Sequence, residues 1–248
     1  IFDNSAYEML HRSNVSWPCF SVDWLIPEYF IPQTFKNFYS PLEIRMYKDE
    51  FPYTCYFIAG AQTSEKNGYL YYMKWFNMHK TMHDDDPDKE ADSESEGAEP
   101  LMEHIEIQAK GNVNKVKTMK NSFITAYQSD LKTIELVDLR NHIREMEERW
   151  QDEDEKNIKT NKKKNKLDTK NVHVKSFKKK DEGFALDWSN FNEGVFASGG
   201  YNNEVEIYIP VDEFCSDYTG GENNKFNFRT KFKAHKNGVE DICFSPSN

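Results

Sequence analysis

The sequence predicts an antiparallel all-β fold. Short runs of aromatic and β-branched residues recur along most of the 248-residue chain, separated by turn residues. Several runs alternate apolar and polar positions, as in Val205-Glu206-Ile207-Tyr208-Ile209, and this period is typical of a half-buried strand. Aromatic residues make up 15% of the chain, which argues against a wholly disordered protein. Many short strands at this spacing indicate a sandwich, a barrel or a propeller.

One helix is expected before the strands. Ser5 and Glu8 form an S-x-x-E capping box ahead of residues 6–12, and Asn14 is a stop signal. A second amphipathic stretch covers His142–Gln151. The expected strands are Phe20–Leu25, Thr54–Ala61, Tyr69–Trp75, Ile105–Ala109, Asn114–Met119, Ser122–Tyr127, Thr133–Asp138, Phe184–Trp188, Val195–Ser198, Glu204–Ile209, Asn227–Phe232 and Val239–Phe244.

Charge is distributed unevenly along the chain. The total of 42 acidic and 32 basic residues gives a net charge of −10, which favours basic partners over nucleic acid for the surface as a whole. His83–Pro100 holds nine carboxylates against one Lys, and it has no large apolar residue. Arg144–Glu155 is again acidic, and Lys156–Lys180 then holds eleven Lys. We expect these segments to be solvated insertions, the first of them a disordered acidic loop.

The sequence offers no catalytic or metal-binding pattern. No G-x-S-x-G, Walker-type or G-x-G-x-x-G string occurs, and the seven His residues lack H-x-x-x-H spacing. The four Cys residues are far apart and form no C-x-x-C pair, so we expect reduced thiols and no zinc site. No apolar stretch is long enough to span a membrane as a helix. We therefore expect a non-enzymatic protein without metal, cofactor or membrane partner.

An internal repeat lies within the predicted strands. Val116, Leu186 and Ile242 occupy equivalent positions, separated by 70 and 56 residues. Propeller blades usually repeat every 40–45 residues, and the longer gap contains the Lys-rich insertion. The repeated segments are Asn112–Thr118, Glu182–Ser189 and Gly238–Pro246.

Several strings of residues resemble WD-repeat proteins. Ala234-His235 stands where such repeats have Gly-His, and Val137-Asp138 and Tyr208-Ile209 fall where Trp-Asp would end a strand. Residues 6–12 and 17–23 resemble the N-terminal segment of histone-binding WD-repeat chaperones. Residues 181–189 and 238–246 resemble the family of glutamate-rich WD-repeat proteins, known in fungi as regulators of ribosome biogenesis. The acidic loop falls where that family has its Glu/Asp-rich tract.

This resemblance implies a WD-repeat β-propeller of seven blades behind a short N-terminal α-helix. The chain would supply about three blades and the opening strand of a fourth. Because an unclosed propeller exposes strand edges, we expect a portion of a longer protein. The expected divisions are an N-terminal helix and first strands at 1–76, the acidic loop at 77–104, a blade at 105–141, the Lys-rich insertion at 142–182, a blade at 183–234 and the start of the next blade at 235–248.

The resemblance also implies a function. The chain would be a scaffold or chaperone in ribosome biogenesis that binds a basic large-subunit ribosomal protein and histones, in the nucleus and nucleolus. Tyr7, Met9 and Leu10 would line a groove for a client helix, or would pack the helix on the propeller. Ser93 and Ser95 are candidate phosphorylation sites. Client capture would rest on the loop carboxylates Asp84, Asp85, Asp86, Asp88, Glu90, Asp92, Glu94, Glu96 and Glu99.

Other residues have expected structural or targeting roles. His235 would bond across its blade, and Trp17, Phe184, Trp188 and Phe244 would be core residues. A group of lysines could be a nuclear localisation signal, an RNA contact or a partner of the neighbouring acids; without interleaved aromatics, no sequence-specific nucleic-acid binding is expected. These are Lys162, Lys163, Lys164, Lys166, Lys178, Lys179 and Lys180. The alternative function is a substrate receptor in a ubiquitin ligase complex, for which WD propellers are often used.

Overall fold

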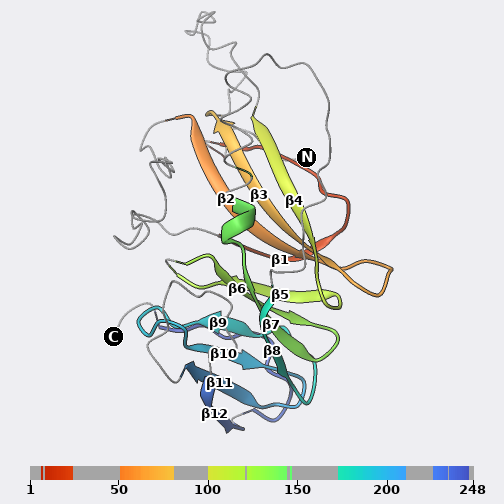
Figure 1. The fold of residues 1–248 in the computed structure, drawn as a ribbon, viewed down its shortest axis with the longest axis vertical. Coiled ribbons are helices and arrows are strands. Elements are labelled where there is room, and N and C mark those ends of the chain that lie inside the picture. The colour runs from red at the N-terminus through yellow and green to blue at the C-terminus, as the bar shows by residue number, and fades with distance from the viewer. Residues whose placement is uncertain are drawn as a thin grey trace, which may run out of the picture.

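In the computed structural model, the described part of the chain forms three antiparallel four-stranded sheets (Figure 1). The structure describes residues 7, 9–24, 51–80, 100–120, 122–143, 146, 173–210, 226–233 and 235–245. The prediction of an all-β fold is therefore confirmed, and three such sheets are consistent with a WD-repeat propeller.

Each sheet is built from strands that follow one another along the chain. The first sheet contains β1 (Cys19–Trp24), β2 (Tyr53–Ala61), β3 (Tyr69–Met78) and β4 (Leu101–Gln108), in that order. The second contains β5 (Val113–Thr118), β6 (Ile124–Ser129), β7 (Thr133–Asp138) and β8 (His173–Lys178), again in order. The third contains β9 (Leu186–Trp188), β10 (Phe196–Gly199), β11 (Val205–Pro210) and β12 (Phe226–Phe232).

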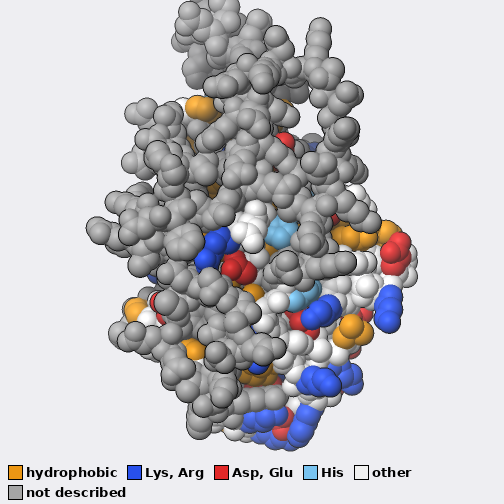
Figure 2. Space-filling model, in the orientation of Figure 1, with side chains coloured by type: hydrophobic (Ala, Val, Ile, Leu, Met, Phe, Trp, Pro, Cys, Tyr) orange, Lys and Arg blue, Asp and Glu red, His pale blue; other side chains and the backbone are white. Residues whose placement is uncertain are grey.

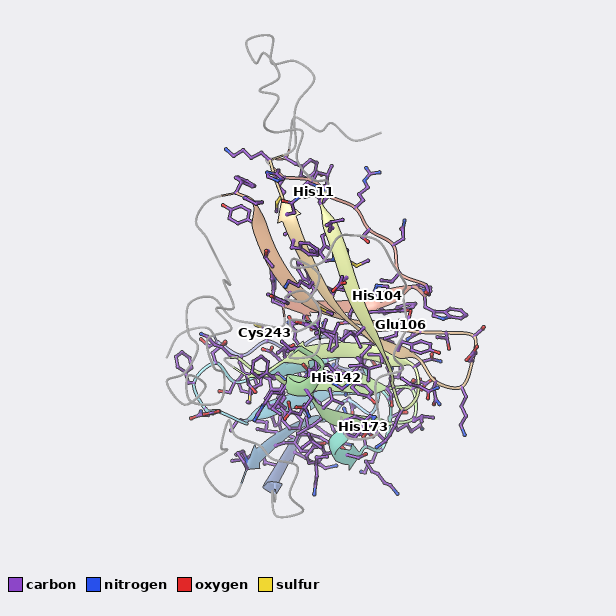
Figure 3. All side chains as sticks on the ribbon, turned by 45° about the horizontal axis from the view of Figure 1, so that its top comes forward. His11, His104, Glu106, His142, His173 and Cys243 are labelled. Atoms are coloured by element: carbon purple, nitrogen blue, oxygen red, sulfur yellow. The ribbon has the colours of Figure 1, made fainter. Side chains whose placement is uncertain are left out.

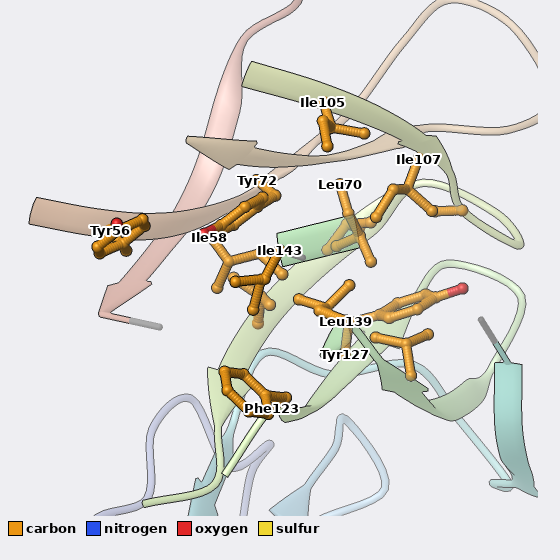
Figure 4. Packing of buried hydrophobic residues seen from close by; sticks show 14 of the residues in the cluster. Tyr56, Ile58, Leu70, Tyr72, Ile105, Ile107, Phe123, Tyr127, Leu139 and Ile143 are labelled. Atoms are coloured by element: carbon orange, nitrogen blue, oxygen red, sulfur yellow. The ribbon is translucent and has the colours of Figure 1, made fainter. Parts of the chain in front are cut away.

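Successive sheets pack face to face through apolar side chains. The first core lies between the first and second sheets, where Ile58, Leu70 and Ile107 face Tyr127 and Leu139 (Figure 4). The second core joins the second and third sheets, and it includes the buried side chains of Ile124, Leu136, Leu186, Trp188, Phe196 and Tyr208. The second sheet thus buries both faces, as expected for the middle member of a stack.

The first strands of the three sheets, which we call the inner strands, are bonded in series. The Thr118 backbone N–H at the end of β5 donates to the Asp23 carboxylate in β1 at 2.7 Å. The Trp188 indole N–H in β9 donates to the Lys117 carbonyl oxygen in β5 at 2.9 Å. In a propeller, too, the inner strands of successive blades lie next to one another around the central axis.

The predicted N-terminal helix is not confirmed. Tyr7 and residues 9–15 have no helical assignment. Polar groups of this segment bond to the first sheet, His11 to the His79 carbonyl oxygen and Ser13 to the Met102 sulfur. These tertiary contacts replace the internal hydrogen bonds that a helix needs, so they outweigh the capping-box signal.

A short helix occurs where the second amphipathic stretch was expected, but it begins earlier. Residues 140–143 and 146 are helical. The Asp138 carboxylate accepts the Arg140 backbone N–H at 2.9 Å, and the Ile143 N–H donates to the Leu139 carbonyl oxygen at 3.0 Å. Asp138 is therefore the N-cap, a role that the strand prediction ending at this residue did not include.

The strand predictions fail at two places. β8 was not predicted, and it lies within the range expected to be a Lys-rich insertion. It is a half-exposed edge strand, and its lysines interrupt the apolar alternation by which a strand is recognised. Val239–Phe244 has no strand assignment in the structure. A first strand pairs with the second strand of its own sheet, and residues 239–245 have no such strand beside them in the described part of the chain.

The sheet boundaries also differ from the expected blades. β4 belongs to the first sheet, although residues 105–108 were assigned to the next blade. The acidic loop, most of which lies outside the described residues, therefore connects β3 and β4 within one sheet. The second sheet runs from Val113 to Lys178, and the long charged segment lies between its last two strands.

Candidate functional site

The candidate site is built on the face of the first sheet that points away from the second sheet, which we call the outer face. Strand register places every second residue on it. Trp24 pairs with Phe57 across β1 and β2, and Tyr71 pairs with Glu106 across β3 and β4. The outer-face side chains include Val22 and Trp24 of β1, Phe57 and Ala59 of β2, Tyr71, Met73 and Trp75 of β3, and Met102, His104 and Glu106 of β4. Phe20 lies at a bulge of β1, two residues before Val22.

The N-terminal segment covers the β3–β4 half of the outer face. Val15 and Trp17 pack against Tyr71, Met73 and their neighbours. Ser16 donates to the Glu106 carboxylate at 3.4 Å, and the Gln62 backbone N–H donates to the Pro18 carbonyl oxygen at 3.2 Å. The extended chain is thus held at several points along its length.

The β1 half of the outer face is open. Phe20, Val22 and Trp24, which we call the open row, are 61%, 55% and 52% exposed. Trp24 packs against Phe57 with ring centroids 4.5 Å apart, and Phe57 meets Trp75 at 5.8 Å. Three adjacent exposed apolar side chains on a rigid strand are a typical contact surface for a partner.

One hydrogen bond joins the N-terminal segment to the base of the acidic loop. The His11 ring nitrogen Nε2 lies 2.9 Å from the His79 carbonyl oxygen, so this nitrogen carries the proton and donates. His79 follows the last residue of β3, and the acidic run begins a few residues later. His11 therefore sits where the acidic segment leaves the sheet, beyond His104 and Glu106 on β4 (Figure 3).

The outer face itself carries an acidic side chain, Glu106. His104 Nε2 lies 3.5 Å from the Glu106 carboxylate. Burial, with the nearby charge of Glu106, raises the pKa of the Tyr71 hydroxyl, so this residue is neutral over the physiological range. The outer face therefore combines aromatic surface with a carboxylate, and it carries no lysine or arginine among the described side chains assigned to it above.

The residues predicted to line a client groove lie at the start of this segment. Tyr7 is exposed, and Met9 and Leu10 are half-buried. They have no helical assignment, so any surface that they offer is not a helix face. The predicted loop carboxylates, Asp84 to Glu99, lie outside the described residues, and so do Ser93 and Ser95.

The predicted structural residues have different environments. Trp188 is buried at 4% exposure, whereas Trp17, Phe184 and Phe244 are half-buried. His235 is exposed, and its predicted bond across a blade stays a prediction.

The predicted localisation lysines divide into two groups. Lys162, Lys163, Lys164 and Lys166 lie outside the described residues. Lys178 ends β8, and the turn after it is packed: Lys179 donates to the Gly199 carbonyl oxygen at 2.8 Å, and Lys180 pairs with Glu204 at 3.5 Å. This second group is thus part of the sheet structure.

Sequence reasoning missed two aspartates that connect the inner strands. Asp23 accepts both the Thr118 N–H and the Lys117 ammonium, the latter at 3.2 Å. Asp187 accepts the Phe244 backbone N–H at 2.7 Å, in the equivalent position of β9. Both also line a pocket of about 220 Å³ at this end of the inner strands. The available signal was the repeated F-x-x-D-W string at residues 20–24 and 184–188.

The described residues provide neither a metal-binding cluster nor a membrane-spanning helix. No group of three or more His, Cys, Asp or Glu side chains in the described part of the chain could hold a metal ion. The described cysteines, Cys19, Cys55 and Cys243, are free thiols. No helix among the described residues is long and apolar enough to cross a membrane.

Known proteins resemble the chain over its whole length. A protein from Dictyostelium discoideum named "Glutamate-rich WD repeat-containing protein 1" is 28% identical over 263 aligned positions, covering 99% of this chain. The "Ribosome assembly protein rrb1" of Schizosaccharomyces pombe is 28% identical over 256 aligned positions, covering 100% of it. The chain is thus similar to a glutamate-rich WD-repeat protein over almost its whole length. The resemblance inferred from the sequence is therefore confirmed.

Two further comparisons show similarity to the chain or to part of it. The family of the "Histone-binding protein RBBP4", which also includes a component of the CAF1 complex, matches residues 1–79, the part that contains the N-terminal segment and β1 to β3. An Arabidopsis thaliana protein named "Protein HEAT STRESS TOLERANT DWD 1" is 26% identical over 99% of the chain. The chain spans about half the length of these curated relatives, with 46%, 45% and 50% of each covered.

Proposed function

We propose that the chain is a non-enzymatic scaffold that binds Lys/Arg-rich proteins and keeps them soluble before assembly. One observation carries this proposal: the His11–His79 hydrogen bond brings the N-terminal segment to the base of the acidic loop. The exposed aromatic side chains of β1 lie on the outer face of the first sheet, which the N-terminal segment also covers in part. An apolar contact surface and a source of negative charge are thereby attached to one rigid support.

The two parts of the site would act at different stages of binding. Nine carboxylates within His83–Pro100 attract a cationic client over a Debye length of about 8 Å at physiological salt. This attraction accelerates encounter but discriminates poorly between basic proteins. The open row would then provide shape-specific contact, since buried aromatic side chains usually contribute most of the binding free energy in an interface.

The relatives favour particular clients. The matched family is described as histone-binding, and its match covers residues 1–79, which include the N-terminal segment and the outer-face residues of β1 to β3. The fission yeast relative is named for ribosome assembly. We therefore propose histones and a basic large-subunit ribosomal protein as clients, and the nucleus and nucleolus as the site of action.

The proposal is tested by affinity purification of the chain from native lysate in parallel with a variant whose nine loop carboxylates are replaced by Asn and Gln. We expect histones or basic ribosomal proteins with the wild-type chain and a marked loss of both with the variant. Recovery of ubiquitin-ligase adaptor proteins, unaffected by the substitutions, would instead support the substrate-receptor alternative and contradict the chaperone role.

A further inference from the structure

The second and third sheets carry a basic surface of a different kind from the outer face. At several ion pairs the lysine is exposed while the carboxylate is buried beneath it. Lys180 and Lys233 have side chains that are 68% and 62% exposed, and each lies 3.5 Å from the Glu204 carboxylate, which is 9% exposed. Lys110 similarly lies over Glu135 at 3.1 Å, with exposures of 52% and 1%. Solvent therefore meets ammonium groups at these pairs, although the pairs are formally neutral.

The lysines converge on one point of the third sheet. Lys180, Lys231 and Lys233 all lie within 3.7 Å of Glu204. Lys231 also pairs with Glu206, whose carboxylate is buried and accepts the Tyr208 hydroxyl. Three cations thus surround two buried carboxylates, which leaves one positive charge in excess.

The direction in which the pKa of Glu204 is shifted is consistent with this excess of positive charge. Burial acts to raise it, but the positive charges of Lys180, Lys231 and Lys233 outweigh burial and hold the pKa below its usual value. Glu204 is therefore ionised at neutral pH, and it holds the three ammonium groups close together while it offsets only one of their charges.

This cluster continues along the edges of two sheets. β8 and β12 are the edge strands of the second and third sheets, and Lys178 and Lys236 are further exposed lysines at or beyond their ends. We call Lys178, Lys180, Lys231, Lys233 and Lys236 the lysine rim. Basic side chains gather on this part of the surface, over the two lower sheets (Figure 2). The first sheet, with the outer face, lies at the opposite end of the molecule (Figure 1).

We propose that the lysine rim binds the phosphate backbone of single-stranded RNA. Lys231 lies in β12 and Lys233 directly follows the last residue of β12. Two residues of extended chain span about 6.7 Å, which is similar to the spacing of successive phosphates in an extended nucleic-acid strand. Lysines contact phosphates as point charges and need no base platform, so the rim would bind RNA without reading its sequence. Phe232 lies between Lys231 and Lys233 in the chain and is 46% exposed, and an exposed aromatic side chain next to cations can stack on a base of a single strand whatever its sequence.

The test measures binding of the 248-residue chain to a fluorescein-labelled 20-nucleotide poly(U) RNA by anisotropy over a salt series. The rim variant carries Lys178→Gln, Lys180→Gln and Lys233→Gln, whose side chains are exposed. The control carries Lys66→Gln, Lys80→Gln and Lys120→Gln, three exposed lysines elsewhere, so both variants lose the same charge. Thermal unfolding of both variants establishes that they fold.

The expected result is a selective loss in the rim variant. Each phosphate contact to a single strand adds about −0.7 to the slope of log affinity against log salt, so the rim variant should lose about 2 units of slope and about tenfold or more in affinity. The control should retain the wild-type slope. Equal slopes for wild type and rim variant, or no binding of poly(U) at about 50 mM salt, would overturn the proposal. Binding of a labelled poly-Glu peptide through the rim in the absence of poly(U) binding would also overturn it, in favour of an acidic protein partner.

Discussion

The His11 ring donates a hydrogen bond to the His79 carbonyl oxygen at 2.9 Å, between residues 68 positions apart in the chain. This bond ties the N-terminal segment to the end of β3, where the acidic loop begins. His11→Ala should therefore loosen residues 9–17, while the free energy of unfolding changes by less than about 0.5 kcal/mol, because both partners are at the surface. Hydrogen exchange and limited proteolysis measure the first effect. His235→Ala, at another exposed histidine, is the control and should leave exchange in residues 9–17 unchanged.

The open row is expected to contribute to client binding but little to stability. Phe20→Ser with Trp24→Ser removes two aromatic side chains that are more than half exposed. We expect a loss of about 2 kcal/mol or more in binding to a histone, since interface aromatics are frequent hot spots. Phe191→Ser changes an aromatic residue that is 50% exposed between β9 and β10, and it serves as the matched control. Equal client affinity for both variants in a titration would exclude the open row from the interface.

Asp187 is expected to stabilise the packing of residues 239–245 on the third sheet. Asp187→Ala leaves the Phe244 N–H without its acceptor at 2.7 Å, and it should cost about 1–3 kcal/mol of unfolding free energy. Asp241→Ala removes an ion pair with Lys115 in which the carboxylate is 73% exposed, and it should cost about 0–1 kcal/mol. Urea unfolding of the two variants compares these costs directly. A larger loss of unfolding free energy for Asp241→Ala than for Asp187→Ala would contradict the stabilising role assigned to Asp187.

Glu135 should make stability depend on pH. Burial acts to raise its pKa, but the His173 ring 3.6 Å away, hydrogen bonds from Ser176 and Lys110, and the charge of Lys110 outweigh burial and hold the pKa below its usual value. A carboxylate with a depressed pKa stabilises the fold above its unfolded-state pKa of about 4.3, and this contribution is lost as the pH falls through the folded-state pKa.

Glu135→Gln should accordingly reduce the unfolding free energy at pH 7 by about 1–3 kcal/mol. The difference from wild type should narrow as the pH falls below about 4. Glu65→Gln, at an exposed turn residue, controls for the loss of one charge. Urea unfolding at several pH values measures the difference, and a gap that widens toward acid pH would show that the sign is wrong.

The sequence predicts the strands well where their side chains alternate. Thr133–Asp138 agrees with β7 at both ends, and eleven of the twelve observed strands overlap a predicted one. β8 escaped prediction because an edge strand can carry lysines such as Lys175 and Lys178 without burying them. The capping box at Ser5 and Glu8 is a local signal, and the contacts of His11 and Ser13 with distant strands outweigh it.

The candidate site was predictable only in part. Composition alone identifies the acidic loop, but it does not show that the loop and residues 9–18 meet at one sheet, because this depends on the pairing of β3 with β4. The open row is missed because Phe20, Val22 and Trp24 have the pattern of an ordinary strand face, and only the arrangement of the sheets shows it to be uncovered. The role of Asp23 and Asp187 could have been suspected from their shared F-x-x-D-W string.

The most direct test of the central claim is client affinity as a function of salt. The wild-type chain is compared with a variant in which the nine carboxylates of residues 84–99 become Asn or Gln. A control variant replaces the seven carboxylates of Arg144–Glu155 instead, a loss of two fewer negative charges. Titration with a labelled histone from low to physiological salt should show steep weakening for the wild type and the control, and weaker, flatter binding for the loop variant. Unchanged affinity and an unchanged salt slope in the loop variant would contradict electrostatic capture by the acidic loop.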